Sequence, residues 1–313
     1  MPAALRRLLY PVLLIVGAAL AVTALLGIAT ILAYPHLPSL EALTDYQPKI
    51  PLRVFTADGY LIGEFGEERR ALVSIDEVPT ILKQAIISAE DERFYQHGGV
   101  DTLGVLRAAY SNFLGGGKRQ GASTITMQVA RNFFLTREKT LSRKLYEALL
   151  AFKIEHNLSK NDILQIYINQ IYLGQRAYGF AAASQIYFGK ALKELNVAEA
   201  AMLAGLPKAP SAYNPVANPK RAKLRQMYVL RRMHELGSID DAQLAEAQKQ
   251  VLTVKHDVND FGVHAEFVAE MARQIAYEQF QEDIYSKGLR VITTITLADQ
   301  EAAYSSLRKG VMD

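Results

Sequence analysis

The sequence contains no cysteine among its 313 residues. Disulfides, thiolate metal sites and a cysteine nucleophile are therefore excluded, and the chain is compatible with an oxidising compartment. The six histidines are scattered, with no His-Glu-x-x-His motif and no acidic calcium-binding loop. A glycine-rich nucleotide loop and a repeat of fixed period are missing as well. These absences argue against a metalloenzyme, a thiol enzyme and a nucleotide-dependent enzyme.

A strong overall charge is also lacking. The net charge is +3, and the composition, 50% apolar and 21% charged, is that of an ordinary globular protein. The charge is unevenly distributed, because between residues 118 and 153 eight cations face Glu138 and Glu147 alone: Lys118, Arg119, Arg131, Arg137, Lys139, Arg143, Lys144 and Lys153. Such an excess suits pyrophosphate, anionic lipid headgroups or nucleic acid. An ordinary surface salt bridge would explain any single pair.

The N-terminus lacks charge altogether. No Asp, Glu, Lys or Arg occurs from Leu8 to Leu40, and residues 8–34 are almost wholly apolar. This is longer than the roughly 7–15 apolar residues of a cleaved signal peptide and enough for a membrane-spanning helix, which needs about 20. Arg6 and Arg7 precede it, so the positive-inside rule places the N-terminus in the cytoplasm. We predict a cytoplasmic tail over 1–7, a transmembrane anchor over 8–34 and a proline-containing linker over 35–51.

The rest of the chain has mainly helical periodicity. Residues 52–65 predict a β-hairpin around Asp58-Gly59, and the pattern becomes helical from Pro79. A glycine-rich basic loop predicts a mobile segment around 111–122, and the β-branched stretch 288–297 predicts a strand that opens a further domain. The predicted helices after the first cover 102–114, 123–135, 139–157, 160–172, 175–187, 196–206, 218–236 and 240–250.

Four charged residues, 90–93, follow the helix that starts after Pro79. The helix macrodipole disfavours a carboxylate at a C-terminus, so local propensity gives no reason for Glu90. A carboxylate held there among apolar neighbours such as Phe94 would have a raised pKa, which suits a general base or acid. A solvated, charged helix end is the alternative, and the run alone leaves both open.

Polar side chains recur in the predicted helix 123–135. Thr124, Gln128 and Arg131, with Asn132 beside them, are spaced three to four residues apart, and Ser123 is the predicted N-cap. Amide side chains are common partners of sugar hydroxyls and phosphates, although a plain cap with a solvated face would give the same pattern. On the next helix Arg143 and Lys144 fall on the same side as Glu147.

Together these segments resemble the glycosyltransferase domain of class A penicillin-binding proteins, of the 1A type. Five motifs occur in the family's order, over residues 90–98, 121–128, 143–147, 163–190 and 198–215, and the similarity extends over about 50–313. The resemblance implies a mainly α, lysozyme-like fold with a small β-hairpin, preceded by one transmembrane helix. It also implies a glycosyltransferase domain over 52–236 and a helical/β linker over 237–313 that leads to a missing transpeptidase domain.

The implied activity is polymerisation of lipid II into glycan strands at the outer face of the cytoplasmic (inner) membrane, with release of undecaprenyl pyrophosphate. Lipid II, the growing glycan strand, membrane lipid and cell-wall accessory proteins are the implied partners, and nucleic acid is not. No cofactor is expected to be required, with Mg²⁺ or Mn²⁺ as an optional aid. Two other functions stay open: a lysozyme-like lytic glycosidase, which would not need the cations of 118–153, and a non-catalytic cell-wall scaffold.

The resemblance also assigns site residues. Glu90 corresponds to the general base and Glu147 to a second acidic residue that assists the departing pyrophosphate. The implied substrate-binding residues are Asp91, Phe94, His97, Ser123, Thr124, Gln128, Arg131, Asn132, Arg143 and Lys144. Met127 departs from the family, which often has a second glutamine there. Ser306 to Lys309 matches a Ser-x-x-Lys pattern, but no Lys-Thr-Gly follows it, so no penicillin-binding activity is assigned.

Overall fold

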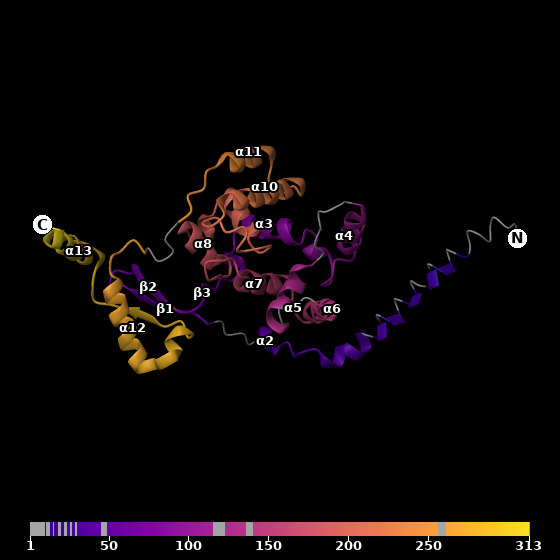
Figure 1. The fold of residues 1–313 in the computed structure, drawn as a ribbon, viewed down its shortest axis with the longest axis horizontal. Helices are drawn as coiled ribbons and strands as arrows, with labels where there is room; N and C mark the ends of the chain where they lie inside the picture. Colours follow the sequence, from indigo (N-terminus) through magenta and orange to yellow (C-terminus); the bar gives the residue numbers. More distant parts are fainter. Residues whose placement is uncertain are drawn as a thin grey trace.

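The computed structural model describes residues 30–44, 49–114, 123–135, 140–255 and 261–312, with scattered positions between 10 and 28. Figure 1 shows a central helical lobe, made of α3 to α11, and a smaller sheet lobe, made of β1, β2, β5 and α12. The mainly helical fold with a small sheet confirms the predicted class at this level. The greater part of the predicted mobile segment, 115–122, lies outside the described residues.

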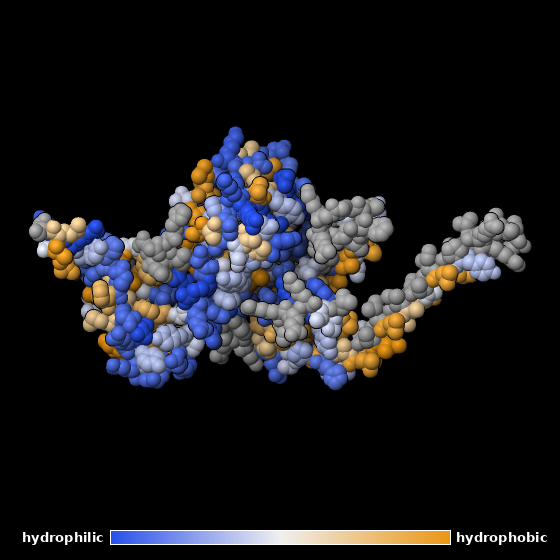
Figure 2. Space-filling view, viewed as in Figure 1, coloured by the Kyte–Doolittle hydropathy of each residue, from blue (hydrophilic) through white to orange (hydrophobic). Residues whose placement is uncertain are grey.

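The described helical positions before residue 34 extend away from the helical lobe (Figure 1). These positions carry exposed apolar side chains, such as Leu14 at 73%, Leu25 at 66% and Ile31 at 72% exposure. Figure 2 shows hydrophobic orange along this arm. In the described part of the chain, no helix has both the length and the apolar character to cross a membrane. Many residues of the predicted anchor 8–34 lie outside that part.

The elements before and between the two lobes are short. They are η1 (Tyr34–His36), α2 (Glu41–Thr44), β3 (Arg69–Arg70) and η2 (Ile75–Glu77). The helical lobe then contains, in chain order, α3 (Thr80–Glu90), η3 (Phe94–Gln96), α4 (Thr102–Leu114), α5 (Ile125–Phe134), α6 (Leu141–Asn157), α7 (Lys160–Gln170), β4 (Ala177–Tyr178), α8 (Phe180–Phe188), η4 (Leu192–Glu194), α9 (Val197–Gly205), α10 (Pro219–Glu235) and α11 (Asp241–Lys249).

Local capping explains several helix starts. Ser159 caps α7 with Asp162 three residues later, and Asn196 caps α9 with Glu199. Each is a reciprocal capping box, in which the N-cap side chain and the third helical side chain each satisfy a free backbone N–H. Seven of the predicted helices agree within two residues at each end with α4, α5, α6, α7, α9, α10 and α11.

The predicted helix 175–187 is wrong at its start. Gly174, Gln175 and Arg176 all have left-handed backbone, with φ of +89°, +48° and +61°, and such residues cannot continue a right-handed helix. The chain instead forms β4, which pairs in parallel with β3, and α8 begins only after Gly179. A side chain at Gly179 would come within 3.0 Å of backbone atoms of α7, so this position needs glycine.

The sheet lobe joins two distant parts of the chain. β1 (Leu52–Phe55) and β2 (Leu61–Phe65) form the predicted hairpin, and β5 (Arg290–Ile292) adds to β1 in parallel. The sheet packs against α12 (Glu266–Phe280), a helix that the sequence analysis does not predict, and η5 (Gln281–Tyr285) and α13 (Leu297–Met312) complete this region.

The contact between sheet and α12 is close. An added side chain at Gly63 of β2 would lie 2.7 Å from the Ala269 Cβ of α12. The buried core here includes Leu52, Val54 and Ile284, separate from the core of the helical lobe. The sheet therefore unites residues on both sides of position 236, where the predicted glycosyltransferase domain ends.

Candidate active site

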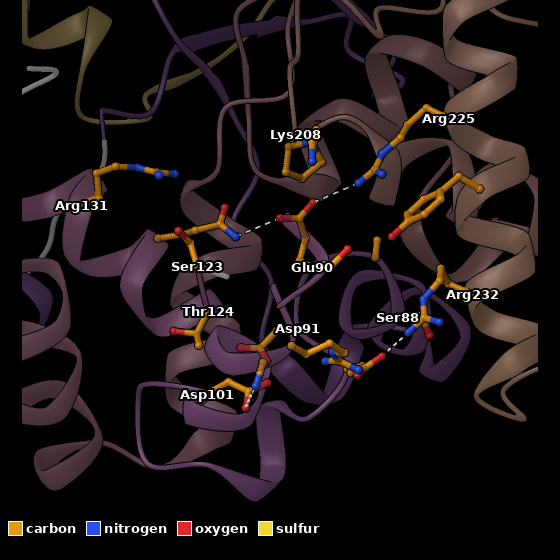
Figure 3. A pocket seen from close by; sticks show the side chains of 18 residues that line it. Ser88, Glu90, Asp91, Asp101, Ser123, Thr124, Arg131, Lys208, Arg225 and Arg232 are labelled. Carbon is orange, nitrogen blue, oxygen red and sulfur yellow. Dashed lines mark hydrogen bonds and ion pairs between the residues drawn. The ribbon is translucent and has the colours of Figure 1, made fainter. Parts of the chain in front are cut away.

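A cleft of about 760 Å³ opens on the helical lobe where the end of α3 meets α4, α5 and α10 (Figure 3). Its lining is strongly polar and includes five cationic side chains. The lining residues are Ser88, Ala89, Glu90, Asp91, Glu92, Asp101, Gly104, Arg107, Ser111, Ser123, Thr124, Gln128, Arg131, Pro207, Lys208, Arg225, Tyr228 and Arg232. The predicted base, Glu90, is thus placed in the cleft.

Glu90 is the last residue of α3, and its side chain is only 10% exposed. Burial raises the pKa of this carboxyl, while the Gln128 hydrogen bond and then the Arg225, Lys208 and Arg131 charges act in the opposite direction. Gln128 Nε2 donates to Glu90 Oε2 at 2.9 Å. Glu90 Oε1 is buried and accepts no hydrogen bond from any described residue. A partly desolvated carboxylate with a free oxygen is suited to accept a proton.

Three cations approach Glu90 from different sides in Figure 3: Arg131 of α5, Lys208 after α9, and Arg225 of α10. Arg225 Nη2 lies 3.5 Å from Glu90 Oε1, and its guanidinium stacks 4.5 Å from the centre of the Tyr228 ring. The sequence pattern indicates Arg131 but not Lys208 or Arg225. Since α10 carries several Lys and Arg residues, their spacing could not show which one faces Glu90.

Asp91 lines the cleft but is committed to structural contacts. Its Oδ2 accepts the Ile125 N–H at 3.0 Å, and His97 Nε2 lies 3.0 Å from both carboxylate oxygens. His97 Nδ1 accepts the Gly99 N–H, so Nε2 is the nitrogen that carries the proton and donates to Asp91. Asp91 and His97 together tie the end of α3 to the start of α5, which carries Gln128.

Glu92 and Arg93, the next two charged residues, also form contacts between helices. Glu92 pairs with Arg107 of α4 at 2.5 Å and with Arg232 of α10. Arg93 pairs with Asp101, whose Oδ1 accepts the Gly104 N–H in the first turn of α4. The run 90–93 is therefore not a solvated helix end, because each of its charges contacts a different part of the cleft wall.

The predicted N-cap of α5 is off by one residue. Thr124, not Ser123, caps this helix, since its Oγ1 accepts the Met127 N–H at 3.1 Å. The same hydroxyl donates to the Gly99 carbonyl at 2.6 Å, and the side chain is buried. Ser123 Oγ instead accepts from Lys144 Nζ at 2.8 Å. Thr124 therefore supports the cleft wall, and Ser123 is the hydroxyl that contacts a cation.

Glu147 lies in the second turn of α6 with its side chain fully buried, and it is not among the residues that line the cleft. Lys144 Nζ donates to its Oε2, and Arg143 Nε lies 3.6 Å from its Oε1. Lys144 links this carboxylate to Ser123 on the cleft wall. The structure thus brings Arg143, Lys144 and Glu147 together, as the spacing predicts, behind the cleft surface.

Two further predicted residues are set apart from the cleft. Phe94 is fully buried in the core, with its ring 6.3 Å from the ring of His97. Asn132 is exposed on α5 and does not line the cleft. Within the described residues, no group of three or more potential metal-ligating side chains is found.

Known proteins resemble this chain closely. A family model described as Transglycosylase matches residues 58–234. Penicillin-binding protein 1A of Neisseria flavescens is 54% identical over 94% of this chain and 37% of its own length. Penicillin-binding protein 1A of Pseudomonas aeruginosa is 46% identical over 89% of this chain and 34% of its own length. A crystal structure of penicillin-binding protein 1A from Haemophilus influenzae is 31% identical, covers 82% of this chain and 28% of that chain, and has a TM-score of 0.46.

The chain spans only 34% to 37% of the length of these two curated relatives. The family match nevertheless covers more than half of the chain and includes Glu90, Gln128, Glu147 and Arg225. The resemblance drawn from the five motifs is confirmed. The chain therefore belongs to the transglycosylase family, with a transglycosylase domain of the penicillin-binding protein 1A type.

Proposed function

We propose that this domain polymerises lipid II into glycan strands, with Glu90 as the general base. Glu90 takes the proton of the acceptor sugar's 4-hydroxyl, and that oxygen attacks the anomeric carbon of the donor with inversion. The bond between this carbon and the pyrophosphate oxygen breaks, and undecaprenyl pyrophosphate leaves with the bonding electrons. One glycosidic bond forms, one sugar-phosphate bond breaks, and the proton stays on Glu90 until it passes to solvent.

The observation that carries this proposal is the setting of Glu90. Its carboxylate is buried at the wall of a cleft, is oriented by Gln128, and keeps Oε1 without a hydrogen bond from any described side chain or backbone group. Burial raises its pKa, which strengthens it as a proton acceptor from a weakly acidic hydroxyl. The other carboxylates of the cleft are engaged at short range: Asp91 and Asp101 accept backbone N–H groups, and Glu92 has an arginine at each oxygen.

The cations of the cleft supply the second requirement. A pyrophosphate leaving group carries negative charge that increases as the bond breaks, so fixed cations stabilise the transition state. Arg131 and Lys208 line the cleft, and we assign the pyrophosphate to them together with Arg143 and Lys144. Glu147 holds these last two cations in place, so its role is to orient the groups that bind the leaving group.

The apolar N-terminal segment supports a membrane setting for this activity. Its described apolar side chains are largely exposed, and a lipid-linked substrate is reached most easily from a membrane. We propose that residues 8–34 anchor the chain in the inner membrane with the cleft on the periplasmic side. Membrane lipid, the glycan strand and cell-wall accessory proteins are its proposed partners, nucleic acid is not, and the longer parent protein is proposed to carry a transpeptidase domain.

A bound cofactor is not required in this proposal. Mg²⁺ or Mn²⁺ would act on the substrate's pyrophosphate charge beside the protein cations. Polymerisation in excess EDTA should therefore retain at least part of its rate, and its complete and reversible loss would contradict this view.

The decisive experiment is incubation of the purified chain with labelled lipid II, followed by sizing of the products. The wild type should elongate lipid II, and Glu90→Gln should abolish elongation while its melting temperature stays close to that of the wild type. Glu199→Gln is a matched control, since Glu199 is also a buried, ion-paired glutamate but does not line the cleft. Release of fragments from finished peptidoglycan would support a lytic glycosidase, and a wild type that changes neither substrate would support a scaffold.

A further inference from the structure

Tyr167 has a buried hydroxyl that the fold does not use. The side chain lies on α7, is 1% exposed, and its Oη has no hydrogen-bond partner among the described residues. A buried hydroxyl without a partner costs free energy relative to phenylalanine at the same position. Such a group in a native protein calls for an explanation, and a role in the active site is one of them.

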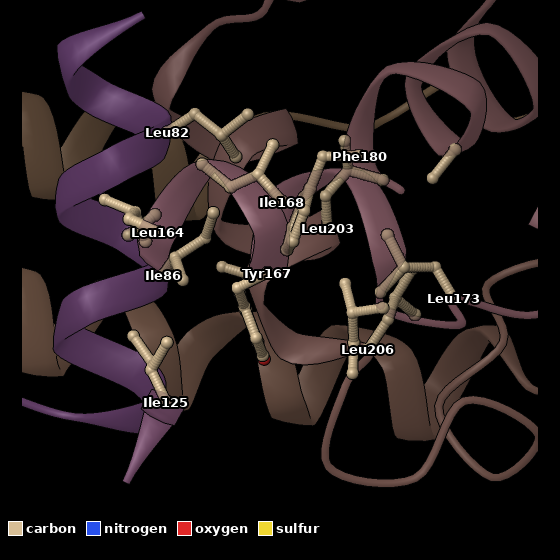
Figure 4. Packing of buried hydrophobic residues seen from close by; sticks show 14 of the residues in the cluster. Leu82, Ile86, Ile125, Leu164, Tyr167, Ile168, Leu173, Phe180, Leu203 and Leu206 are labelled. Carbon is tan, nitrogen blue, oxygen red and sulfur yellow. The ribbon is translucent and has the colours of Figure 1, made fainter. Parts of the chain in front are cut away.

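The hydroxyl lies under the cleft. Figure 4 shows the Tyr167 ring beside Ile86 of α3, with its oxygen directed past Ile86 toward the level of Ile125 at the start of α5. Ile86 is one helical turn before Glu90, so this direction leads to the end of α3 where Glu90 lies. Among the buried side-chain atoms that lack a hydrogen bond within the described chain are both Tyr167 Oη and Glu90 Oε1.

The electrostatic surroundings agree with this placement. Burial raises the pKa of Tyr167 well above its usual value, and the charge of Glu90 raises it further. The phenol therefore stays protonated, and toward a carboxylate oxygen it acts as the donor. Other charged groups act on Glu90 from the neighbouring elements, namely Arg131 of α5, Lys208 after α9 and Arg225 of α10, with Asp91 next to it in the chain.

We propose that the Tyr167 hydroxyl is a positioning group for the base, and that it donates a hydrogen bond to Glu90 Oε1 through one water molecule. This inference rests on the proposed function of Glu90. Arg225, the cation near the same oxygen, is 3.5 Å away and lies on the cleft wall, where a bound anion would compete for it. When Arg225 turns to an anionic substrate, Tyr167 keeps a donor on the carboxylate and so favours its charged, proton-accepting form.

Tyr187 offers a matched control. It is also fully buried, but its hydroxyl donates to the Leu173 carbonyl at 2.9 Å. Tyr187 is not among the residues that line the cleft. Removing its hydroxyl breaks a buried hydrogen bond, whereas removing the hydroxyl of Tyr167 breaks no hydrogen bond to a described residue. The two Tyr→Phe variants thus separate a structural role from a positioning role.

The first test is a pH titration of Glu90 by NMR of side-chain ¹³C-labelled glutamate, in which the Glu90→Gln variant identifies the Glu90 signal. The second is the pH profile of lipid II polymerisation. Tyr167→Phe should raise the midpoint of Glu90 by about one pH unit, because a donor to the charged form is lost. The acid limb of the activity profile should move upward with it, and the melting temperature should stay equal or rise. Tyr187→Phe should lower the melting temperature and leave the Glu90 midpoint unchanged.

An unchanged Glu90 midpoint in Tyr167→Phe would overturn the proposal. So would a fall in melting temperature as large as that of Tyr187→Phe, because the hydroxyl would then be structural. The titration does not depend on turnover. If the wild type fails to polymerise lipid II but the midpoint still shifts, the proposed function is wrong and the contact between Tyr167 and Glu90 is right.

Discussion

The surroundings of Glu90 and Glu147 differ in where their partners come from. Both carboxylates are buried beside cations, but the cations of Glu147 are on its own helix, three and four residues before it. Those of Glu90 come from residues 131, 208 and 225, on other elements. Both carboxylates keep Oε1 buried and without a hydrogen bond within the described chain, but Glu147 lies behind the cleft with a cation near each oxygen, whereas Glu90 lines the cleft. A carboxylate neutralised by its own helix behind the cleft organises charge, while one that lines the cleft can reach a proton of the substrate.

The largest effect on polymerisation should come from removing the negative charge of Glu90 or of Glu147. Glu90→Gln and Glu147→Gln should both lower polymerisation by about 10²–10⁴-fold, but their stabilities should diverge. Glu147→Gln should lose about 1–3 kcal/mol of unfolding free energy, because it leaves two partly buried cations without their partner. Glu90→Gln should lose no unfolding free energy. Urea denaturation of both variants checks this, and equal losses would remove the distinction between the two sites.

The direction in which folding stability changes with pH at Glu90 follows from its raised pKa. Because burial raises that pKa, the folded state holds the proton more tightly than the unfolded state does. Glu90 therefore favours folding most below the usual glutamate pKa and loses that contribution as the pH rises through the raised value. Glu90→Gln should flatten this part of the stability profile, and an unaltered profile would contradict the buried, proton-binding state.

Arg143→Ala tests the charge that Glu147 organises. We expect kcat/KM at low lipid II to fall by about 10–100-fold, because a charged contact to pyrophosphate is lost. Lys153→Ala is the control, since Lys153 is on the same helix but donates to the Pro38 carbonyl. Near-wild-type turnover of Arg143→Ala at low lipid II would exclude the pyrophosphate role.

Arg225→Ala tests the distant partner of Glu90. Loss of this cation should raise the pKa of Glu90 further, so the acid limb of the activity profile should move to higher pH and the rate at neutral pH should fall by about tenfold. Arg221→Ala, one turn earlier on α10 and exposed, should leave the limb in place. A limb that moves in neither variant would show that Arg225 does not act on the base.

The smallest effect on activity should come from Ser123, whose hydroxyl links Lys144 beside Glu147 to the cleft wall. Ser123→Ala removes the hydroxyl that accepts from Lys144, and since Glu147 still holds that cation we expect about a twofold rise in the apparent KM for lipid II. Ser142→Ala, which removes an exposed hydroxyl on the same helix as Lys144, should change nothing. Steady-state kinetics of the two variants will show whether Lys144 needs its second partner.

Most helix positions could be predicted from apolar periodicity and caps, since both act within a few residues. The predictions that failed depend on contacts between residues far apart in the sequence. The start of α8 depends on three consecutive left-handed residues, and Gly179 is required by the backbone of α7. The strand β5 was recognisable from its β-branched residues, but its pairing with β1, more than 230 residues earlier, leaves no local signal in the sequence.

The same division applies to the site. By itself the sequence determined the identity of the motif residues, the family, and the grouping of Arg143, Lys144 and Glu147, because helical spacing places those three on one side. Only the tertiary structure decided that Thr124 rather than Ser123 caps α5, that Asp91 holds His97, and that Arg225 and Tyr167 belong to the surroundings of Glu90. Those contacts depend on how α5, α7 and α10 pack around the end of α3, and packing between distant segments is set by the whole core rather than by the residues adjacent to the base.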